Sequence, residues 1–522
     1  VDNWTQATLN YPLTIGDHLY ADEGARAEMH IGSSGIRLAP GTSMSFLNLD
    51  DRTVQIQITE GAISLRIRHL DDSELYEIDT PNGAISLLRT GEYRIDTDPD
   101  RNATMVTVRS GEAEATANGA SFAIHPQQTA YFTGDGAQQD VRSANPPDAF
   151  DQFCEQRDRR EDAAPAPRYV SREMVGYEDL EAHGAWRTVP EYGAVWVPRV
   201  EVGWAPYRFG HWAWVEPWGW TWIDNAPWGF APFHYGRWAF IAGSWGWIPG
   251  PVAVRPVYAP ALVAFVGGNH WSVSLNLGGG GGVAWFPLGP REVYQPAYHV
   301  SPAYVNRVNV TNVTNITNVT NVTNVNRTNI TNVKYVNQTV PGAVTAVSRQ
   351  DFVTSRPVAR AAVPVSPAAI ASAPVESSAA IAPRRESILA NDAGRPVPQP
   401  RAMFAQRQVI TKTAPPPRPV SFAVKQQALQ ANPGRPVDPA TLRTLRTERP
   451  APAGRIGIDA APVRTDNGLN RERQIQHQHQ IQRRQEIKRN NREERIQERK
   501  DAPAKPHPRE EKKTEEKKPG ER

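Results

Sequence analysis

The sequence predicts an all-β protein followed by a long disordered C-terminal half. Three observations lead to this fold class. Apolar and polar residues alternate along 1–140, a tryptophan-rich stretch repeats at a regular spacing, and the rear is rich in Pro, Ala and Arg without a sustained apolar pattern. The predicted parts are a β sandwich or roll (1–140), a linker (141–170), a Trp-rich domain (171–292), an Asn/Thr spacer (300–340), a disordered region (341–468), a polar helix (469–500) and a charged disordered tail (501–522).

The predicted β module, 1–140, has the period of half-buried strands. In the stretch RAEMHI, Ala27, Met29 and Ile31 face one way, whereas Glu28 and His30 face the other. The same alternation recurs, with Gly, Pro and Asn turn signals between the runs, in TVQIQI, AISLRIR, YEID and MVTV. Many short strands at this spacing are typical of a sandwich or roll rather than of a helical domain.

An ordered set of motifs makes residues 5–135 resemble the FecR-type domain. The set comprises PLTIGDHLYADEGARAEMHI, IRLAPGTSMSF, VQIQITEGAISLRI, YEIDTPNGAISLLRTGEYRID and VTVRSGEAEA. The resemblance implies an exported β module, because the domain is periplasmic in that family. The founding members relay transporter occupancy to a sigma factor, but this sequence shows neither their anti-sigma segment nor their transmembrane run. A signal-sensing regulator is therefore an alternative and not the main expectation.

Several features concern the cellular compartment. The chain begins at Val1 rather than Met, which predicts a removed export signal or an incomplete start. The single cysteine, Cys154, excludes an internal disulfide and is compatible with an exported protein that does not rely on one. No run approaches the ~18 apolar residues of a membrane helix. We expect a protein of the bacterial periplasm or cell envelope that is not an integral membrane protein.

The tryptophans are concentrated in one repeated stretch. Fourteen of the 15 lie between Trp186 and Trp285. Gly-x-Trp triplets begin at the evenly spaced positions Gly184, Gly210 and Gly236, and two alternating runs follow within each unit of this 26-residue repeat. In the middle unit these runs, HWAWV and WGWTWI, flank Glu-Pro-Trp-Gly, which predicts a type I turn. We expect three β-hairpins whose aromatic faces stack into a core, because one hairpin alone would be marginally stable.

Two roles are open for these indole rings. The favoured one is a core, since each buried ring removes roughly 150–250 Å² from water. The alternative is an exposed platform that stacks on sugar rings, and its candidate ligand-binding residues are Trp212, Trp214, Trp220, Trp222 and Trp238. Residues 170–290 also resemble, through WAPYRFGHWAWVEPWGWTWID and PWGFAPFHYGRW, the Trp-rich region that follows FecR-type domains in a group of uncharacterised bacterial proteins. That group has no established activity, so the resemblance implies no reaction.

The rear of the chain differs in charge from the front. Residues 1–350 carry 25 Lys and Arg against 36 Asp and Glu, whereas residues 351–522 carry 33 against 19. The basic rear is interpreted as a soluble linker and tail, with weak polyanion binding as the alternative. The Asn-x-Thr triplets of 309–333 predict an extended spacer that can pair with copies of itself.

No arrangement of residues predicts an enzyme. Cys154 has no nucleophile signature around it, and His477 and His479 would diverge on a helix. We therefore predict no catalytic residue, no metal site and no cofactor. The titratable residues among the tryptophans are Glu216, Asp224, His211 and His234.

The expected function is a non-enzymatic envelope scaffold or interaction protein of unknown partner, with an envelope protein or a polysaccharide as candidates. The alternative is a cell-wall carbohydrate-binding module that uses exposed Trp faces.

Overall fold

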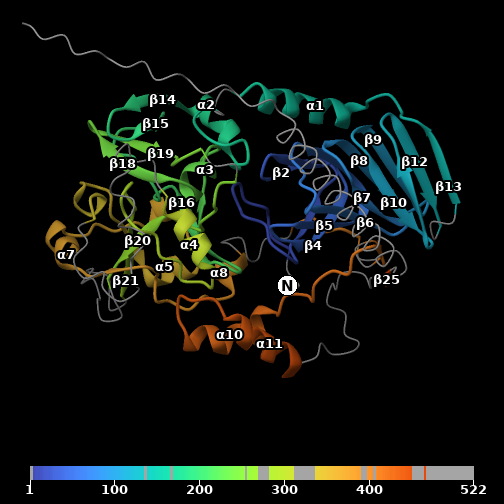
Figure 1. Ribbon diagram of the computed structural model, residues 1–522. Helices are drawn as coiled ribbons and strands as arrows, with labels where there is room; N and C mark the ends of the chain where they lie inside the picture. The colour runs from blue at the N-terminus through green and yellow to red at the C-terminus, as the bar shows by residue number, and fades with distance from the viewer. Residues whose placement is uncertain are drawn as a thin grey trace, which may run out of the picture. The chain divides into compact units, whose positions relative to one another are not determined.

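The structure is a computed structural model that describes residues 4–134, 138–164, 168–252, 255–267, 281–310, 335–389, 397–401, 404, 407–448 and 464–465 (Figure 1). Strands dominate its regular structure, which confirms the predicted all-β class. The described elements belong to one compact unit, Val1–Thr465. The predicted polar helix, the charged tail and most of the Asn/Thr spacer lie outside the described residues.

The first module is built on β5 (Thr53–Ile67). Its first part pairs with β4 (Thr42–Leu49) and β6 (Leu75–Thr80), and its second part pairs with β3 (Ser34–Leu38) and β8 (Gly91–Asp98). β5 therefore takes part in two sets of strands, and the apolar side chains of both sets form one core. The other strands are β1 (His18–Ala21), β2 (Ala27–Ile31), β7 (Gly83–Leu87), β9 (Ala103–Ser110), β10 (Ala113–Ala117), β11 (Ala120–Ile124), β12 (Gln128–Thr133) and β13 (Gln138–Ser143).

Gly61 allows β5 to pass from one set of strands to the other. Its φ of +87° lies in the left-handed region, which L side chains rarely adopt. A Cβ at this position would also lie 2.5 Å from Thr42 Cα on the neighbouring strand. The close approach of two backbones thus requires glycine here.

The predicted linker contains helix α1 (Ala149–Asp162), which runs along one edge of the first module (Figure 1). Asp148 caps its start by accepting hydrogen bonds from the backbone N–H groups of Phe150 and Asp151. Phe150 and Cys154 pack against Ala39 and Ala62 of the β module. The helix is therefore part of the first module's packing.

The 26-residue repeat forms three hairpins, as expected. The strands are β14 (Gly184–Val189) and β15 (Gly193–Pro198), β16 (Gly210–Val215) and β17 (Gly219–Asp224), and β18 (Arg237–Ile241) and β19 (Ser244–Ile248). The first and third hairpins join through β15 and β19 in a four-stranded sheet, whereas the middle hairpin is a separate two-stranded sheet.

The middle turn differs from the predicted type I turn. The Glu216–Pro217 peptide bond is cis, and Trp218 N donates to Val215 O at 3.0 Å. The turn therefore spans 215–218 with proline in its third position, where a cis proline belongs.

The Trp-rich module extends beyond the predicted end at residue 292. Strands β20 (Val263–Val266) and β21 (Gly282–Pro287) pair with β23 (Val375–Glu376) and β22 (Thr345–Ser348). The predicted disorder from residue 341 is thus wrong for this segment. Composition misled the prediction because it averages over many residues, whereas a few apolar side chains suffice here. Val347, Phe352 and Val353 are buried in the tryptophan core.

Short helices and two small strands complete the described chain. None of the described helices combines the length and hydropathy needed to cross a membrane. These elements are η2 (Tyr177–Asp179), α2 (Leu180–His183), α3 (Ala231–His234), α4 (Pro302–Val308), η4 (Asn337–Thr339), α5 (Arg349–Val353), α6 (Val358–Ala361), α7 (Pro367–Ser372), α8 (Glu386–Leu389), β24 (Ile410–Thr411), α10 (Phe422–Ala431), α11 (Pro439–Glu448) and β25 (Arg464–Thr465).

Replacing Gly61 by alanine should destabilise the first module strongly. The Gly61→Ala chain should lose about 2 kcal/mol or more beyond the cost of the left-handed backbone alone, because the new methyl group overlaps Thr42. Denaturant unfolding measures the loss. The matched control is Gly119→Ala, where φ is +77° and no atom lies within 4 Å of the added Cβ. Equal losses in the two variants would contradict the close-approach argument.

Candidate functional site

The five candidate ligand-binding tryptophans lie inside the protein. Trp212, Trp214, Trp220, Trp222 and Trp238 are between 0% and 7% exposed. A platform for sugar rings needs open ring faces, so the exposed-platform alternative does not fit these side chains. Their burial agrees with the favoured interpretation of the repeat as a folded core.

The indole rings meet as cross-strand pairs. Trp212 faces Trp222 in the middle hairpin, with ring centroids 5.6 Å apart and an edge-to-face geometry. Equivalent pairs occur in the other hairpins, as Trp186 with Trp196 and Trp238 with Trp247. One repeated register thus places two indoles side by side in every unit.

Most of the buried indole N–H groups have an acceptor within the protein. Those of Trp186, Trp212 and Trp214 have none within the described part of the chain. Six other Nε1–H groups donate to Leu180 O (Trp196, 3.0 Å), Ile381 O (Trp220, 3.0 Å), Asp224 Oδ2 (Trp222, 3.0 Å), Pro232 O (Trp238, 2.9 Å), Tyr235 O (Trp247, 2.8 Å) and Tyr207 O (Trp285, 2.9 Å).

The titratable residues among the tryptophans have structural partners or are buried as neutral groups. Burial raises the pKa of Asp224 to about 7, and its carboxyl group accepts from Trp222 Nε1 and Ala226 N. Burial lowers the pKa of His211 and of His234 to about 4, so both imidazoles are neutral at pH 7. Glu216, the fourth, forms an ion pair with the ammonium group of Lys425. The surroundings of these groups are those of a folded interior.

Cys154 does not have the surroundings of a reactive thiol. Its side chain is buried between α1 and the first module. Burial raises the pKa of the thiol to about 11, which keeps it protonated at neutral pH.

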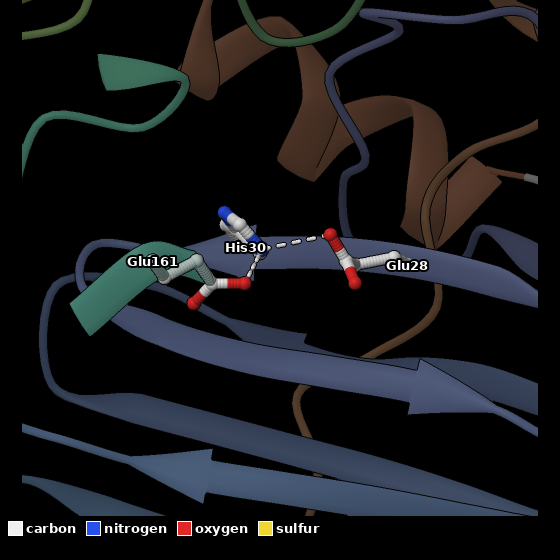
Figure 2. A group of neighbouring side chains, drawn as sticks. All are labelled: Glu28, His30 and Glu161. Carbon is white, nitrogen blue, oxygen red and sulfur yellow. Dashed lines mark ion pairs between the residues drawn. The ribbon is translucent and has the colours of Figure 1, made fainter. Parts of the chain in front are cut away.

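The charged side chains around His30 form a dense polar cluster that connects different parts of the fold. The imidazole Nδ1 lies 2.7 Å from Glu178 Oε1. Its Nε2 lies 3.5 Å from Glu161 Oε1 and 3.6 Å from Glu28 Oε1, which are ion-pair distances too long for good hydrogen bonds (Figure 2). β2, α1 and η2 thus each supply a carboxylate to one histidine.

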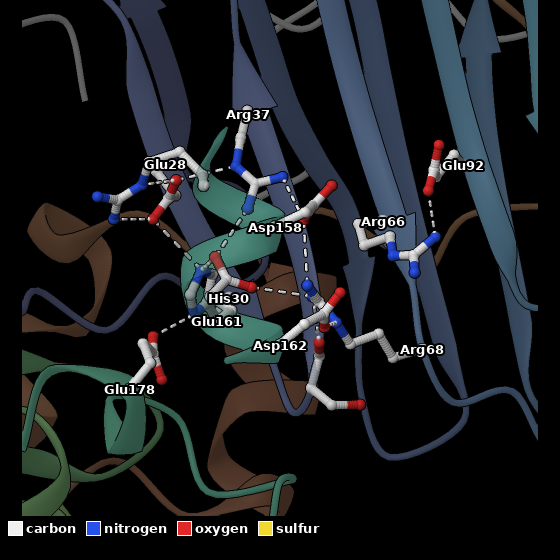
Figure 3. A network of polar contacts seen from close by, with 12 residues as sticks. Glu28, His30, Arg37, Arg66, Arg68, Glu92, Asp158, Glu161, Asp162 and Glu178 are labelled. Carbon is white, nitrogen blue, oxygen red and sulfur yellow. Dashed lines mark hydrogen bonds and ion pairs between the residues drawn. The ribbon is translucent and has the colours of Figure 1, made fainter. Parts of the chain in front are cut away.

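Arginines complete this cluster (Figure 3). Arg37, whose side chain is fully buried, donates to Glu28 at 2.9 Å, Asp158 at 2.9 Å and Glu161 at 2.7 Å. Arg68 reaches Glu161 at 2.9 Å from the neighbouring strand end, and Arg157 on α1 pairs with Glu28 at 2.5 Å. Each of these carboxylates therefore has a cationic partner, which buried charges require.

The protonation of His30 follows from these neighbours. Burial alone would lower the His30 pKa, but the contacts with Glu161, Glu178 and Glu28 outweigh it and hold the pKa well above 6.5. The histidine therefore carries a positive charge at neutral pH. We interpret the cluster as a charged joint between the first module and the segment that leads into the Trp-rich module.

The same residues do not suit a resident metal ion. Ligand atoms of Glu28, His30 and Glu161 lie within 4.8 Å of one another, as do those of His69, Asp71 and Glu74. Guanidinium groups already neutralise the carboxylates of both groups, and Arg255 reaches Asp71 at 2.8 Å and Glu74 at 2.7 Å. A cation would have to displace these arginines.

Local sequence patterns do not reveal this cluster. Alternation in RAEMHI placed Glu28 and His30 on the polar side of a strand, but nothing local indicated that a helix much later in the chain would cover them. The one local indication of a buried charge is Arg37, which interrupts the otherwise apolar run IRLA.

Replacing Trp222 by alanine should destabilise the Trp-rich module by about 3–5 kcal/mol, because the change removes a fully buried ring and leaves a cavity. Thermal or denaturant unfolding measures the loss. The control is Phe240→Ala on the third hairpin, since this residue is 42% exposed and its replacement should cost far less. Similar losses at both positions would argue against the tryptophan core.

Replacing His30 by glutamine should destabilise the fold in a pH-dependent way. Because the folded-state pKa is raised, the stabilisation by His30 is complete below about pH 6.5 and is lost as the pH rises through the folded-state pKa. Denaturant unfolding near pH 6 should show His30→Gln less stable by about 3 kcal/mol, with a gap that narrows at alkaline pH.

The control for this prediction is His125→Gln, an imidazole that is 61% exposed and 3.7 Å from Glu112. Its effect should stay within about 0.5 kcal/mol. A His30→Gln effect that is equally small, or that does not change with pH, would contradict the charged-joint interpretation.

Comparisons with known proteins give one family match. No curated protein matches the chain. Two crystal structures of a candidate anti-sigma factor from Parabacteroides distasonis ATCC 8503, at 2.50 and 1.65 Å resolution, share 13% and 12% sequence identity, each with a TM-score of 0.23. Each match covers 25% of this chain and 60% of the other, so it spans less than two thirds of that protein. Residues 177–292, which contain all three hairpins, match a family of unknown function, DUF6600.

Proposed function

We propose that this chain is a non-enzymatic interaction protein that acts as a scaffold in the bacterial cell envelope. The observation that carries the proposal is the use of the aromatic side chains as a core. The cross-strand indole pairs and their hydrogen bonds lie inside, so the repeat serves as a folded support. The surfaces of the two β modules are then what the protein offers to partners.

The groups that commonly perform catalysis support the same proposal. The thiol of Cys154 has a raised pKa, and His211 and His234 have lowered pKa values that leave them neutral. Asp224 accepts hydrogen bonds from its own module. General acid–base chemistry needs such groups to meet at one accessible point, and their individual burial favours a structural role.

The envelope location is part of the proposal and comes from the sequence. The ordered motifs of residues 5–135 resemble an exported domain, and the single cysteine is compatible with that setting. Fractionation of the producing bacterium should recover the protein with the periplasm or envelope, and recovery with the cytosol would refute the location.

Incubation of the full chain with peptidoglycan and polysaccharides should release no reducing ends, amines or soluble fragments. Addition of the same glycans should also leave the tryptophan fluorescence unchanged, because the candidate rings are inside. The control is the unfolded chain, in which the emission shifts as the indoles become exposed. Hydrolysis would refute the non-enzymatic role. A saturable shift on glycan addition would support the carbohydrate-binding alternative instead.

A further inference from the structure

One face of the first module carries a polar row across four strands. Through the register of β5, β6, β7 and β10, Gln55 lies beside Glu77, Glu77 beside Ser86, and Ser86 beside Glu114. The alternate residues of these strands point into the apolar core. The outer face of such a sheet is ordinarily solvated. Here Gln55, Glu77 and Ser86 are at most 1% exposed, so something covers them.

A distant segment of the same chain covers this face. Strand β24 packs against β6 and β7, and residues 409–413 read VITKT (orange in Figure 1). Val409, Thr411 and Lys412 are buried by this packing. We call residues 409–413 the covering segment.

The polar row binds the covering segment as a peptide. The Glu77 carboxylate accepts from the backbone N–H groups of Lys412 and Thr413, both at 2.8 Å, and from the Thr413 hydroxyl at 2.6 Å. Gln55 Nε2 donates to Thr413 O at 2.8 Å. These contacts hold an extended backbone in one position, as in peptide-binding sites that use main-chain hydrogen bonds.

Two side chains of the segment are also recognised. The Lys412 ammonium group forms an ion pair with Glu114, and the Thr413 hydroxyl meets Glu77. A carboxylate for an ammonium group and a carboxylate for a hydroxyl select a Lys–Thr pair by chemistry and spacing. The face is therefore specific to a sequence and not only to an extended backbone.

The covering segment leaves part of the face unsatisfied. Gln55 Oε1, Gln57 Oε1, Asp79 Oδ1 and Ser86 Oγ are buried and lack a hydrogen-bond partner within the described part of the chain. Burial and the adjacent Glu77 carboxylate hold the pKa of Asp79 well above its usual range. Buried polar atoms of either kind, donors or acceptors, are normally paired. A ligand with more hydrogen-bonding groups than this segment offers would therefore fit the face better.

We propose that this polar face is a binding site for an extended peptide with a Lys–Thr pair on a partner protein, and that residues 409–413 fill it as an internal ligand which the partner displaces. This inference rests on the proposed interaction role and identifies the polar face as the site where the partner binds. The incomplete pairing under the covering segment is what makes displacement favourable.

A labelled synthetic peptide of residues 407–415, RQVITKTAP, tests the site in the full chain. In the Lys412→Ala/Thr413→Ala chain the internal ligand is weakened, so fluorescence anisotropy should show peptide binding at least about tenfold tighter than in the unmodified chain, where the internal copy competes at high effective concentration. No gain in affinity would overturn the proposal.

Two controls test specificity. The peptide RQVITAAAP, which lacks both recognised side chains, should bind at least about tenfold more weakly to the same variant. A further Glu114→Gln change should also weaken RQVITKTAP, and Glu114 is partly exposed, so this variant is a mild change to the fold. Circular dichroism checks that each variant is folded. Equal affinity of the two peptides, together with no effect of Glu114→Gln, would overturn the proposal. The hydrolysis and glycan-binding experiments test the proposed interaction role separately, so a failure of this site is distinguishable from a failure of that role.

Discussion

The structure depends on the pairing of buried indole rings across the strands of small hairpins. Every ring removes a large apolar area from water, but each also brings one N–H group that must find an acceptor. The hairpins partly meet both demands, because their register places Trp186, Trp212 and Trp238 opposite a second indole, and nearby carbonyl groups accept the N–H groups of Trp196, Trp238 and Trp247. The middle hairpin also depends on a later segment of the chain, since Trp220 Nε1 donates to Ile381 O.

Ion pairs between charged side chains connect the first module to the Trp-rich module. The half-buried His30 and the buried Arg37 are cations whose carboxylate partners come from a strand, a helix and a 3₁₀ turn. Two further contacts, Ser33 with Glu173 and Arg255 with Asp71 and Glu74, connect the same modules. Buried pairs such as Arg37 with Glu161 contribute little net stability but penalise any arrangement that separates them. They therefore specify how the segments fit together.

In the proposed scaffold role, the returning chain provides a means of control. Lys425 reaches Glu216 at the tip of the middle hairpin, and the covering segment lies on the polar face of the first module. The single stretch 409–425 thus contacts both modules. A scaffold held closed by its own chain would expose a recognition surface only when a better ligand competes, which suits the interaction role proposed above.

The sequence alone determined the local elements. Period-2 alternation placed the strands of the first module, and the even spacing of the Gly-x-Trp triplets predicted three hairpins, because both are properties of neighbouring residues. The tertiary structure decided what depends on distant residues. It showed that Trp212 and Trp222 face inward, that 345–376 completes a sheet, that Glu161 and Glu178 converge on His30, and that Lys412 lies against Glu114. A strand pattern tells which side chains share a face, but only the packing of the whole chain tells what covers that face.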